Sequence, residues 1–173
     1  MYPARDRSMT DVVDRATRSR MMSGIGPRDT LPEMTVRRYL HAAGLRFILH
    51  EKGLAGRPDL VFRKYRTVIF ANGCFWHRHK NCKKATTPGT NKQFWMKKFE
   101  SNVARDKRNM RDLKSKGWQV LVIWECELRN VDSIDRLFWK IVGSETVIPE
   151  NQSPENSIIR QYRSHTKRMM GSG

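Results

Sequence analysis

A short segment from residue 72 to residue 82, NGCFWHRHKNC, contains two of the three cysteines and two of the five histidines of the chain. Within it, Cys74, His79 and Cys82 supply three soft or borderline metal ligands in nine residues. The third cysteine, Cys126, lies in the segment IWECEL, which we predict to be a buried strand. Three cysteines and one histidine make a closed tetrahedral zinc set, as in structural sites. The sequence therefore predicts one structural zinc ion that ties a loop to a sheet and leaves His77 outside the ligand set.

A second interpretation of this segment needs no metal. Cys74 and Cys126 would then be thiols of the core, and the histidines would lie on the surface. An odd number of cysteines, three in all, excludes complete disulfide pairing within one chain. We expect the thiols to stay reduced in a cytoplasmic protein. The zinc interpretation is favoured because it gives every cysteine a role.

The chain of 173 residues carries a large excess of positive charge, with 34 lysines and arginines against 17 acidic residues and a net charge of +17. Such an excess predicts a phosphate polymer as the partner, and the alternative is solvated charge with no polyanion. No apolar run approaches the roughly 18 residues that a membrane span requires. The first twenty residues lack the apolar core of a secretory signal. We expect a cytoplasmic monomer with one main domain and no membrane partner.

Hydrophobic periodicity and helix-breaking residues predict the order helix, three strands, helix, strand, helix. A capping box at Thr30 and Glu33 starts the first helix, and Gly44 ends it. The predicted elements are a helix at 29–44, strands within 46–50, 60–62 and 65–73, a long basic helix at 91–116, a strand within 118–128 and a helix at 131–143. The continuous apolar run in 118–128 is typical of a strand buried on both faces. This order predicts an α/β fold with a mixed central β-sheet flanked by helices.

Composition divides the chain into three segments. We predict a flexible N-terminal extension (1–13), one α/β domain (14–143) and a polar, basic C-terminal tail (144–173). The tail contains two prolines, and its last part includes IIRQYRSHTKRMM, with four basic residues and no acid. It either contacts DNA or is disordered.

Two further segments suggest a site for a hard divalent cation. Asp59 opens the strand in GRPDLVF, and the carbonyl of Ala71, near the end of the next strand, can reach the same ion. Magnesium prefers oxygen ligands and keeps several waters, and a metal of this kind assists phosphate hydrolysis. The alternative is that Asp59 is a turn residue before a strand.

Six segments of the chain closely resemble the bacterial very-short-patch-repair (Vsr) endonucleases, in the same order and at the same separations. They are ATRSRMMSGI, RDTLPE, GRPDLVF, VIFANGCFWHRHKNC, FWMKKFESNVARDKR and GWQVLVIWECEL. The resemblance runs from about residue 14 to about residue 129. It implies a PD-(D/E)xK-like nuclease fold without the usual second acid and lysine. It also implies an enzyme of the bacterial nucleoid that uses Mg²⁺ to nick one strand of double-stranded DNA beside a thymine mispaired with guanine.

The resemblance also assigns roles at the predicted active site. Asp59 matches the family's metal-binding aspartate, with the Ala71 carbonyl as a second magnesium ligand. His77 matches the catalytic histidine, which acts as general base or orients water. Glu33 matches a helical glutamate that helps to hold metal-bound water, and Asp106 matches a residue that supports the histidine.

Other matched positions concern zinc and DNA. The residues on zinc positions are Cys74, His79, Cys82 and Cys126. The residues that the resemblance places between DNA bases are Met22, Phe75 and Trp76. The residues on or beside the DNA-contacting part of the long helix are Trp95, Lys98 and Asn102. Inserted apolar side chains unstack a base step most easily where pairing is weak, as in a G·T wobble. The alternative is that these apolar side chains pack within the protein.

Two positions depart from the family pattern, because Ala71 and Asn72 stand where the family often has threonine and histidine. A main-chain carbonyl ligand survives the loss of the threonine side chain, whereas the lost histidine leaves slower nicking or another substrate open. Two alternative functions therefore remain. One is a zinc-stabilised DNA-binding module that does not cut, and the other is a Vsr-like nickase of different specificity, such as a defence nuclease.

Overall fold

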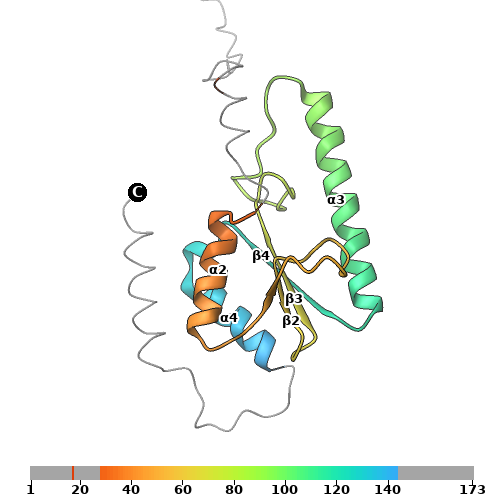
Figure 1. Cartoon of the computed structure of the whole chain (residues 1–173). Coiled ribbons are helices and arrows are strands. Elements are labelled where there is room, and N and C mark those ends of the chain that lie inside the picture. Colours follow the sequence, from red (N-terminus) through yellow and green to blue (C-terminus); the bar gives the residue numbers. More distant parts are fainter. Residues whose placement is uncertain (1–16, 18–27, 144–173) are drawn as a thin grey trace, which may run out of the picture.

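The computed structural model describes Thr17 and residues 28–143 (Figure 1). The elements with bounds in this range are α2 (Leu31–Ala42), β1 (Ile48–Leu49), β2 (Leu60–Phe62), β3 (Thr67–Asn72), α3 (Lys92–Ser115), β4 (Gln119–Trp124), the 3-10 helix η1 (Glu127–Arg129) and α4 (Val131–Val142). The predicted succession of helices and strands is confirmed, with η1 added before α4. The predicted extension (1–13), the tail (144–173) and Met22 lie outside the described residues. Within those residues, no helix combines the length and apolar character that crossing a membrane requires.

The four strands form one sheet in the order β1-β2-β3-β4. β2 pairs antiparallel with both β1 and β3, which confirms the predicted hairpin between 60–62 and 65–73. β3 and β4 run parallel, with Val68 opposite Val120 and Asn72 opposite Trp124. A parallel pair requires a crossover connection, and α3 provides it. The predicted mixed sheet is therefore confirmed.

Alternate residues of β3 supply the two faces of the sheet, as the period of two in a strand requires. Ile69 and Ala71 belong to a large apolar cluster that includes residues of α2 and α4. Val68 and Phe70 belong to a smaller cluster with Leu113 of α3. Figure 1 accordingly shows α3 on one side of the sheet and α2 with α4 on the other. Burying each large aliphatic side chain stabilises this layered arrangement by about 1.5–3 kcal/mol.

The prediction of a strand buried on both faces within 118–128 is confirmed only in part, because β4 packs into the apolar clusters on both faces of the sheet but only one of its residues is fully buried. β4 lies at the edge of the sheet, with a strand neighbour on one side only. Gln119 is exposed, Ile123 is buried, and the other residues of β4 are half-buried. The strand also ends at Trp124, so Cys126 lies beyond it, in the turn that leads into η1. An apolar run alone does not distinguish an edge strand from a central one.

Helix α3 matches the prediction in length, yet its first turns are less buried than its apolar pattern suggested. Phe99 and Leu113 are buried, whereas the side chain of Phe94 is 58% exposed. The reason is geometric. A helix of 24 residues is about 36 Å long, whereas the six residues of β3 span about 20 Å. Part of α3 therefore projects past the sheet (Figure 1).

Candidate functional site

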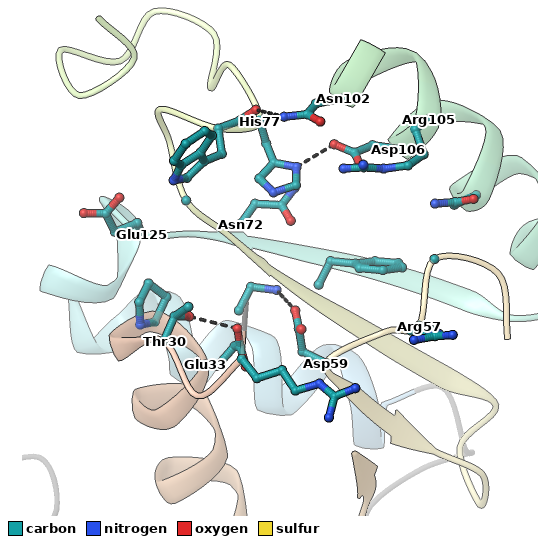
Figure 2. Close-up of a pocket in the computed structure, with 18 of the residues that line it drawn as sticks. Thr30, Glu33, Arg57, Asp59, Asn72, His77, Asn102, Arg105, Asp106 and Glu125 are labelled. Atoms are coloured by element: carbon teal, nitrogen blue, oxygen red, sulfur yellow. Dashed lines mark hydrogen bonds and ion pairs between the residues drawn. The ribbon is translucent and has the colours of Figure 1, made fainter. Parts of the chain in front are cut away.

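A cleft of about 1320 Å³ opens where β3 ends, between the first turn of α2 and the middle of α3 (Figure 2). Its position beside the carboxyl ends of the parallel pair β3 and β4 is a common one for ligand sites in α/β folds. The acidic residues that line it are Asp29, Glu33, Asp59, Asp106 and Glu125. The basic residues that line it are Arg28, Lys52, Arg57 and Arg105, and His77 lies among them. The predicted catalytic residues from α2, from the position before β2 and from the loop after β3 thus share one cleft.

Asp59 is fixed beside the end of β3 by two hydrogen bonds. Its backbone N–H donates to the Ile69 carbonyl at 3.0 Å, and its Oδ2 accepts from the Ala71 N–H at 2.7 Å. The carbonyl of Asn72 accepts from the Glu125 N–H and so faces the β4 side. Because neighbouring residues of a strand point their backbone groups to opposite edges, the Ala71 carbonyl faces the edge where Asp59 lies. A carboxylate and a carbonyl on one edge suit a hard cation.

The electrostatic surroundings of Asp59 favour a bound cation. Burial raises the pKa of Asp59 to about 6, and the nearby charge of Glu33 acts in the same direction. The Ala71 hydrogen bond and the charges of Arg37 and His77 oppose this effect on the pKa but do not cancel it. A divalent cation against the carboxylate would compensate for the lost hydration.

Glu33 is held by a different set of contacts from those that the capping-box prediction implies. Its Oε1 accepts from the Thr30 hydroxyl at 2.9 Å, and its Oε2 accepts from the Asp29 N–H at 3.0 Å. Thr30 is the N-cap residue of α2, but its side chain caps no backbone N–H. The prediction was right about the helix start and wrong about the reciprocal bonds. Glu33 as a whole residue is only 4% exposed, and its carboxylate shares the wall of the cleft with Asp59 (Figure 2).

His50 lies beside Asp59 and Glu33 without lining the cleft, and sequence reasoning missed it. Its Nε2 lies 2.8 Å from Nη2 of Arg37, and its Nδ1 lies 3.7 Å from Oδ1 of Asp59. Because a guanidinium can only donate, Nε2 is the acceptor and the proton is on Nδ1, facing Asp59. Burial, followed by the charge of Arg37, lowers the pKa of His50. The neutral ring therefore connects Arg37 to the predicted metal ligand.

Arg37 takes the place of a cation in a second group of potential metal ligands, which consists of Asp29, Glu33 and His50. One carboxylate oxygen each from Asp29 and Glu33 and one ring nitrogen of His50 lie within 4.8 Å of one another. The guanidinium of Arg37 contacts all three, with 3.1 Å from Nη2 to Glu33 Oε2 and an ion pair to Asp29. The guanidinium therefore offsets one of the two negative charges of this group, and Asp59 is the carboxylate that faces Ala71.

The opposite wall of the cleft carries His77. Its backbone N–H donates to the Gly73 carbonyl at 3.2 Å, which closes a turn directly after β3. Its Nδ1 lies 2.5 Å from Oδ2 of Asp106, a residue of α3. A carboxylate only accepts hydrogen bonds, so Nδ1 carries a proton, and in the neutral imidazole Nε2 keeps the lone pair. In Figure 2 the ring points into the cleft near Asn72, across from Asp59.

The four predicted zinc ligands come together on the loop side of the cleft. Their ligand atoms all lie within 4.8 Å of one another, although Cys126 is far from the others in sequence. His79 Nδ1 lies 3.6 Å from Cys74 Sγ and 3.2 Å from Cys126 Sγ. A tetrahedral zinc ion with ordinary bond lengths requires about 3.5 Å between a sulfur and a nitrogen ligand. The group of Cys74, His79, Cys82 and Cys126 can therefore bind a metal ion, through Nδ1 of the histidine.

The surroundings of this group fix its geometry. The imidazole of His79 stacks on the indole of Trp124, with 4.2 Å between ring centroids and 6° between planes. The backbone N–H of Cys74 donates to Glu125 at 3.4 Å, and Lys84 donates to the same carboxylate at 2.6 Å. Burial raises the pKa of the Cys74 thiol to about 12, so a bound cation is needed to hold it as thiolate. Sequence spacing gave no signal for Trp124 or Lys84.

Phe75 and Trp76 belong to an aromatic cluster that joins the metal-binding loop to α3. The Phe75 ring lies 5.1 Å from Trp76, 5.6 Å from Trp95 and 5.1 Å from Phe99, measured between centroids. Both loop rings are half-buried, and Trp76 lines the cleft. The cluster therefore packs on one side and meets the cleft on the other, which fits packing and insertion alike.

Lys98 and Asn102 of α3 both reach this aromatic cluster. The Nδ2 group of Asn102 donates to the Trp76 carbonyl at 3.2 Å. The Lys98 ammonium lies 5.9 Å from the ring centroids of Trp76 and Phe94. The structure thus brings the predicted DNA-contacting residues of α3 next to the predicted inserting rings.

Comparisons with known proteins indicate the family of the chain. The model of the family described as DNA mismatch endonuclease Vsr matches residues 10–84, a range that includes Glu33, Asp59 and His77. The DNA mismatch endonuclease Vsr of Escherichia coli (strain K12) is 44% identical over 126 residues, which cover 73% of this chain and 80% of that protein. The type II nicking enzyme V.NmeAIP of Neisseria meningitidis serogroup A is 42% identical over 122 residues, covering 70% of this chain and 86% of that protein. The type II nicking enzyme V.XorIIP of Xanthomonas oryzae pv. oryzae is 41% identical over 127 residues, covering 73% and 93%.

The length and level of these matches, together with the two-walled cleft, lead to one assignment. This chain belongs to the DNA mismatch endonuclease Vsr family.

Proposed function

We propose that this protein is a magnesium-dependent endonuclease that nicks one strand of double-stranded DNA next to a T:G mismatch. One observation carries the proposal: the oxygen pair of Asp59 and Ala71 shares a cleft with the His77–Asp106 pair on the opposite wall. A hard-cation site and a base with a free lone pair are the two requirements for water to attack a phosphodiester. The relatives named as a mismatch endonuclease and as nicking enzymes support the same reaction class.

The mechanism follows from these side chains. Asp59 and the Ala71 carbonyl would hold Mg²⁺, which supplies positive charge to the phosphate when bound. Nε2 of His77 accepts a proton from the attacking water, and the oxygen of that water forms a bond to phosphorus. The bond from phosphorus to the leaving oxygen of one strand end then breaks, and that oxygen keeps the electron pair and takes a proton from water. Asp106 stabilises the imidazolium through Nδ1–H, and Glu33, held by Thr30, helps to orient water beside the ion.

A zinc ion at Cys74, His79, Cys82 and Cys126 has a structural role in this proposal. Four protein ligands leave no open position, so such an ion orients the loop and takes no part in hydrolysis. The loop carries Phe75 and Trp76 between the first ligand, Cys74, and His77. The bound zinc ion would therefore position both the aromatic rings and the catalytic base. The rings, together with Met22, would insert beside the mismatch, while Trp95, Lys98 and Asn102 support them and contact DNA.

The remaining features of the proposal concern the chain as a whole. We assign residues 14–143 to the endonuclease domain and regard its fold as PD-(D/E)xK-like, with Asp59 as the remaining acid. We expect a monomer that binds DNA in the cytoplasm, because the net charge of +17 favours a polyanion. The basic tail at 144–173 adds charge for this partner.

The catalytic assignment is tested with paired variants on a nicked-strand assay. Asp59→Ala should remove magnesium-dependent nicking and leave duplex binding nearly unchanged, since the carboxylate lies at the cleft and outside the core. His77→Ala should slow nicking by about 10²–10⁴-fold, the range of acid–base catalysis. Asp112→Ala is the control, because this exposed residue of α3 pairs with Lys116 and is no part of the cleft lining. Wild-type nicking by either cleft variant would overturn the assignment.

Two alternatives have support from particular observations. Asn72 is buried where the family often has histidine, which favours a module that binds DNA and does not cut. Relatives named type II nicking enzymes favour a nickase of different specificity. Strand nicking on matched and mismatched duplexes distinguishes both from the proposed function.

A further inference from the structure

The loop that leads into Asp59 contains an arginine in an unusual backbone conformation. Arg57 has a φ of +48°, in the left-handed region that residues with a Cβ rarely adopt. It also precedes Pro58, and a following proline normally pushes a residue towards extended backbone. Glycine would adopt this conformation with less strain. The backbone therefore gives no reason for an arginine at position 57.

Two other arginines with left-handed backbone provide an internal comparison. Arg66 donates to the Lys116 carbonyl at 2.6 Å, and Arg78 donates to the Thr86 carbonyl at 2.8 Å. Each guanidinium also packs over an aromatic ring, at 5.1 Å and 4.6 Å from the ring centroid respectively. Contacts within the protein thus compensate for the strained backbone at both positions.

Arg57 lacks such compensation. Its guanidinium forms no hydrogen bond, ion pair or ring contact with any residue that the structure describes, and the side chain is exposed along the cleft. Figure 2 shows it at the edge of the cleft, on the loop that continues into Asp59. A strained residue with a charged side chain directed to solvent beside a candidate active site indicates a ligand of opposite charge.

The loop around Arg57 is held against α3, so its backbone is fixed before any ligand binds. Leu54 and Ala55 pack in the apolar cluster that contains Leu113. Gly56 approaches α3 so closely that a Cβ at this position would lie 2.7 Å from Asn109 Nδ2. The Arg57 N–H donates to the Leu54 carbonyl at 3.1 Å. A guanidinium presented from a fixed backbone loses less entropy on binding.

We propose that Arg57 is a phosphate-binding residue that holds a DNA backbone phosphate adjacent to the one attacked at Asp59. This inference rests on the proposed function. The planar guanidinium donates two parallel hydrogen bonds to phosphate oxygens, which fixes both position and orientation. A phosphate contact carries no sequence information, so it would fix the position of the DNA strand in the cleft whatever the base sequence.

Three substitutions separate this role from a structural one. Arg57→Ala should lower the nicking rate at subsaturating enzyme by about tenfold or more, because a charge-assisted bidentate contact is lost. Arg57→Lys should recover part of the rate, since it keeps the charge without the fork. Arg57→Gly should nick as slowly as Arg57→Ala but melt about 2–4 °C above the wild type, because the strain is relieved.

Arg66→Ala is the matched control with the opposite expected signature. Its guanidinium is bound within the protein, away from the cleft lining, so this variant should melt at a lower temperature and nick at the wild-type rate. Loss of both stability and nicking in Arg57→Ala and Arg66→Ala alike would mean that Arg57 has a structural role.

A neutral-phosphate scan locates the contact. Duplexes with one methylphosphonate at a time, within two nucleotides of the nick, remove single negative charges from the substrate. The wild type should lose rate at one position beside the scissile phosphate, and Arg57→Ala should be insensitive at that position. Equal sensitivity of both proteins at every position would overturn the inference.

A binding measurement keeps the test independent of catalysis. The slope of log K against log salt concentration for a matched duplex should decrease by about 0.9 in Arg57→Ala, as expected for one lost phosphate contact. An unchanged slope contradicts the phosphate contact even if the wild type does not nick. Failure of the wild type to nick contradicts the proposed function alone.

Discussion

His77 and Asp106 form a 2.5 Å contact between the imidazole Nδ1 and a carboxylate oxygen across the top of the cleft. The contact connects the loop after β3 to the middle of α3. These two parts of the chain are 29 positions apart in sequence and lie together at the candidate base, His77. It also fixes the tautomer, with the proton on Nδ1 and the lone pair on Nε2. The direction of this hydrogen bond decides whether the histidine can accept a proton from water.

Asp106→Asn tests that tautomer. An asparagine amide can donate to Nδ1, which would place the ring proton on Nε2 and remove the base. We expect nicking to slow by about 10²-fold or more, while duplex binding and the melting temperature stay close to wild type because the side chains have the same shape. Single-turnover nicking checks this, with Asp112→Asn on the same helix as the control. A wild-type rate in Asp106→Asn would show that the pair does not set the base.

Asp59→Asn tests the electrostatics of the metal-binding wall through stability. The pKa of Asp59 is raised to about 6 by burial in the folded protein and is about 3.9 in an unfolded chain. Folding therefore favours the protonated acid. Below about pH 4 both states are protonated and the carboxyl group costs nothing, whereas above about pH 6 the folded protein carries the full cost of a buried charge.

In magnesium-free buffer with zinc retained, Asp59→Asn should accordingly be more stable than the wild type by about 3 kcal/mol above pH 6. The difference should disappear as the pH falls to about 4. Added Mg²⁺ should stabilise the wild type and leave the variant unchanged. Denaturant unfolding at several pH values measures this, and a pH-independent difference would contradict the account of Asp59.

Cys126→Ser tests the zinc site. Purified protein should contain about one zinc ion per chain, since four ligands at suitable separations make a closed site. The variant should lose zinc and melt at a lower temperature, because metal binding contributes to folding free energy. Metal analysis and thermal unfolding give the answer. A variant that keeps stoichiometric zinc would remove Cys126 from the ligand set.

Trp76→Ala tests the insertion hypothesis. Stacking of a base on an aromatic ring contributes roughly 1–3 kcal/mol, so affinity for a T:G duplex should decrease by about one to two decades. Affinity for matched DNA, which depends mainly on phosphates, should change little. Trp139→Ala removes an exposed indole from α4 and serves as the control. Equal losses on both duplexes would mean that Trp76 packs within the aromatic cluster and inserts nowhere.

Features with a local signal were predictable from the sequence. The bounds of α3 agree with the predicted 91–116 within a residue at each end. The polar residue Asn91 precedes the helix and Gly117 follows it, and both are visible in the sequence. The group of candidate metal ligands was predictable because Cys74, His79 and Cys82 are close in sequence and the remaining cysteine had no other role. The His77–Asp106 contact came from the family resemblance, since nothing local connects residues 29 positions apart.

Features that depend on strand order or on distant side chains were not predictable. The edge position of β4 follows from its parallel pairing with β3 alone, and an apolar run does not reveal how many neighbours a strand has. His50 was missed because it and its partners Arg37 and Asp59 belong to three different parts of the chain. Its left-handed backbone conformation also has no signal in the sequence. The reciprocal capping box failed because Arg37 and Asp29 compete for the Glu33 carboxylate.

The central claim is that one cleft combines magnesium, a histidine base and recognition of a T:G mismatch. The most direct test measures strand nicking by the wild-type protein on matched and T:G duplexes of otherwise identical sequence, with and without Mg²⁺. The account predicts nicking of one strand, on the T:G duplex, and only when Mg²⁺ is present. Equal nicking of both duplexes, or nicking without Mg²⁺ in the presence of a chelator too weak to remove zinc, would contradict it.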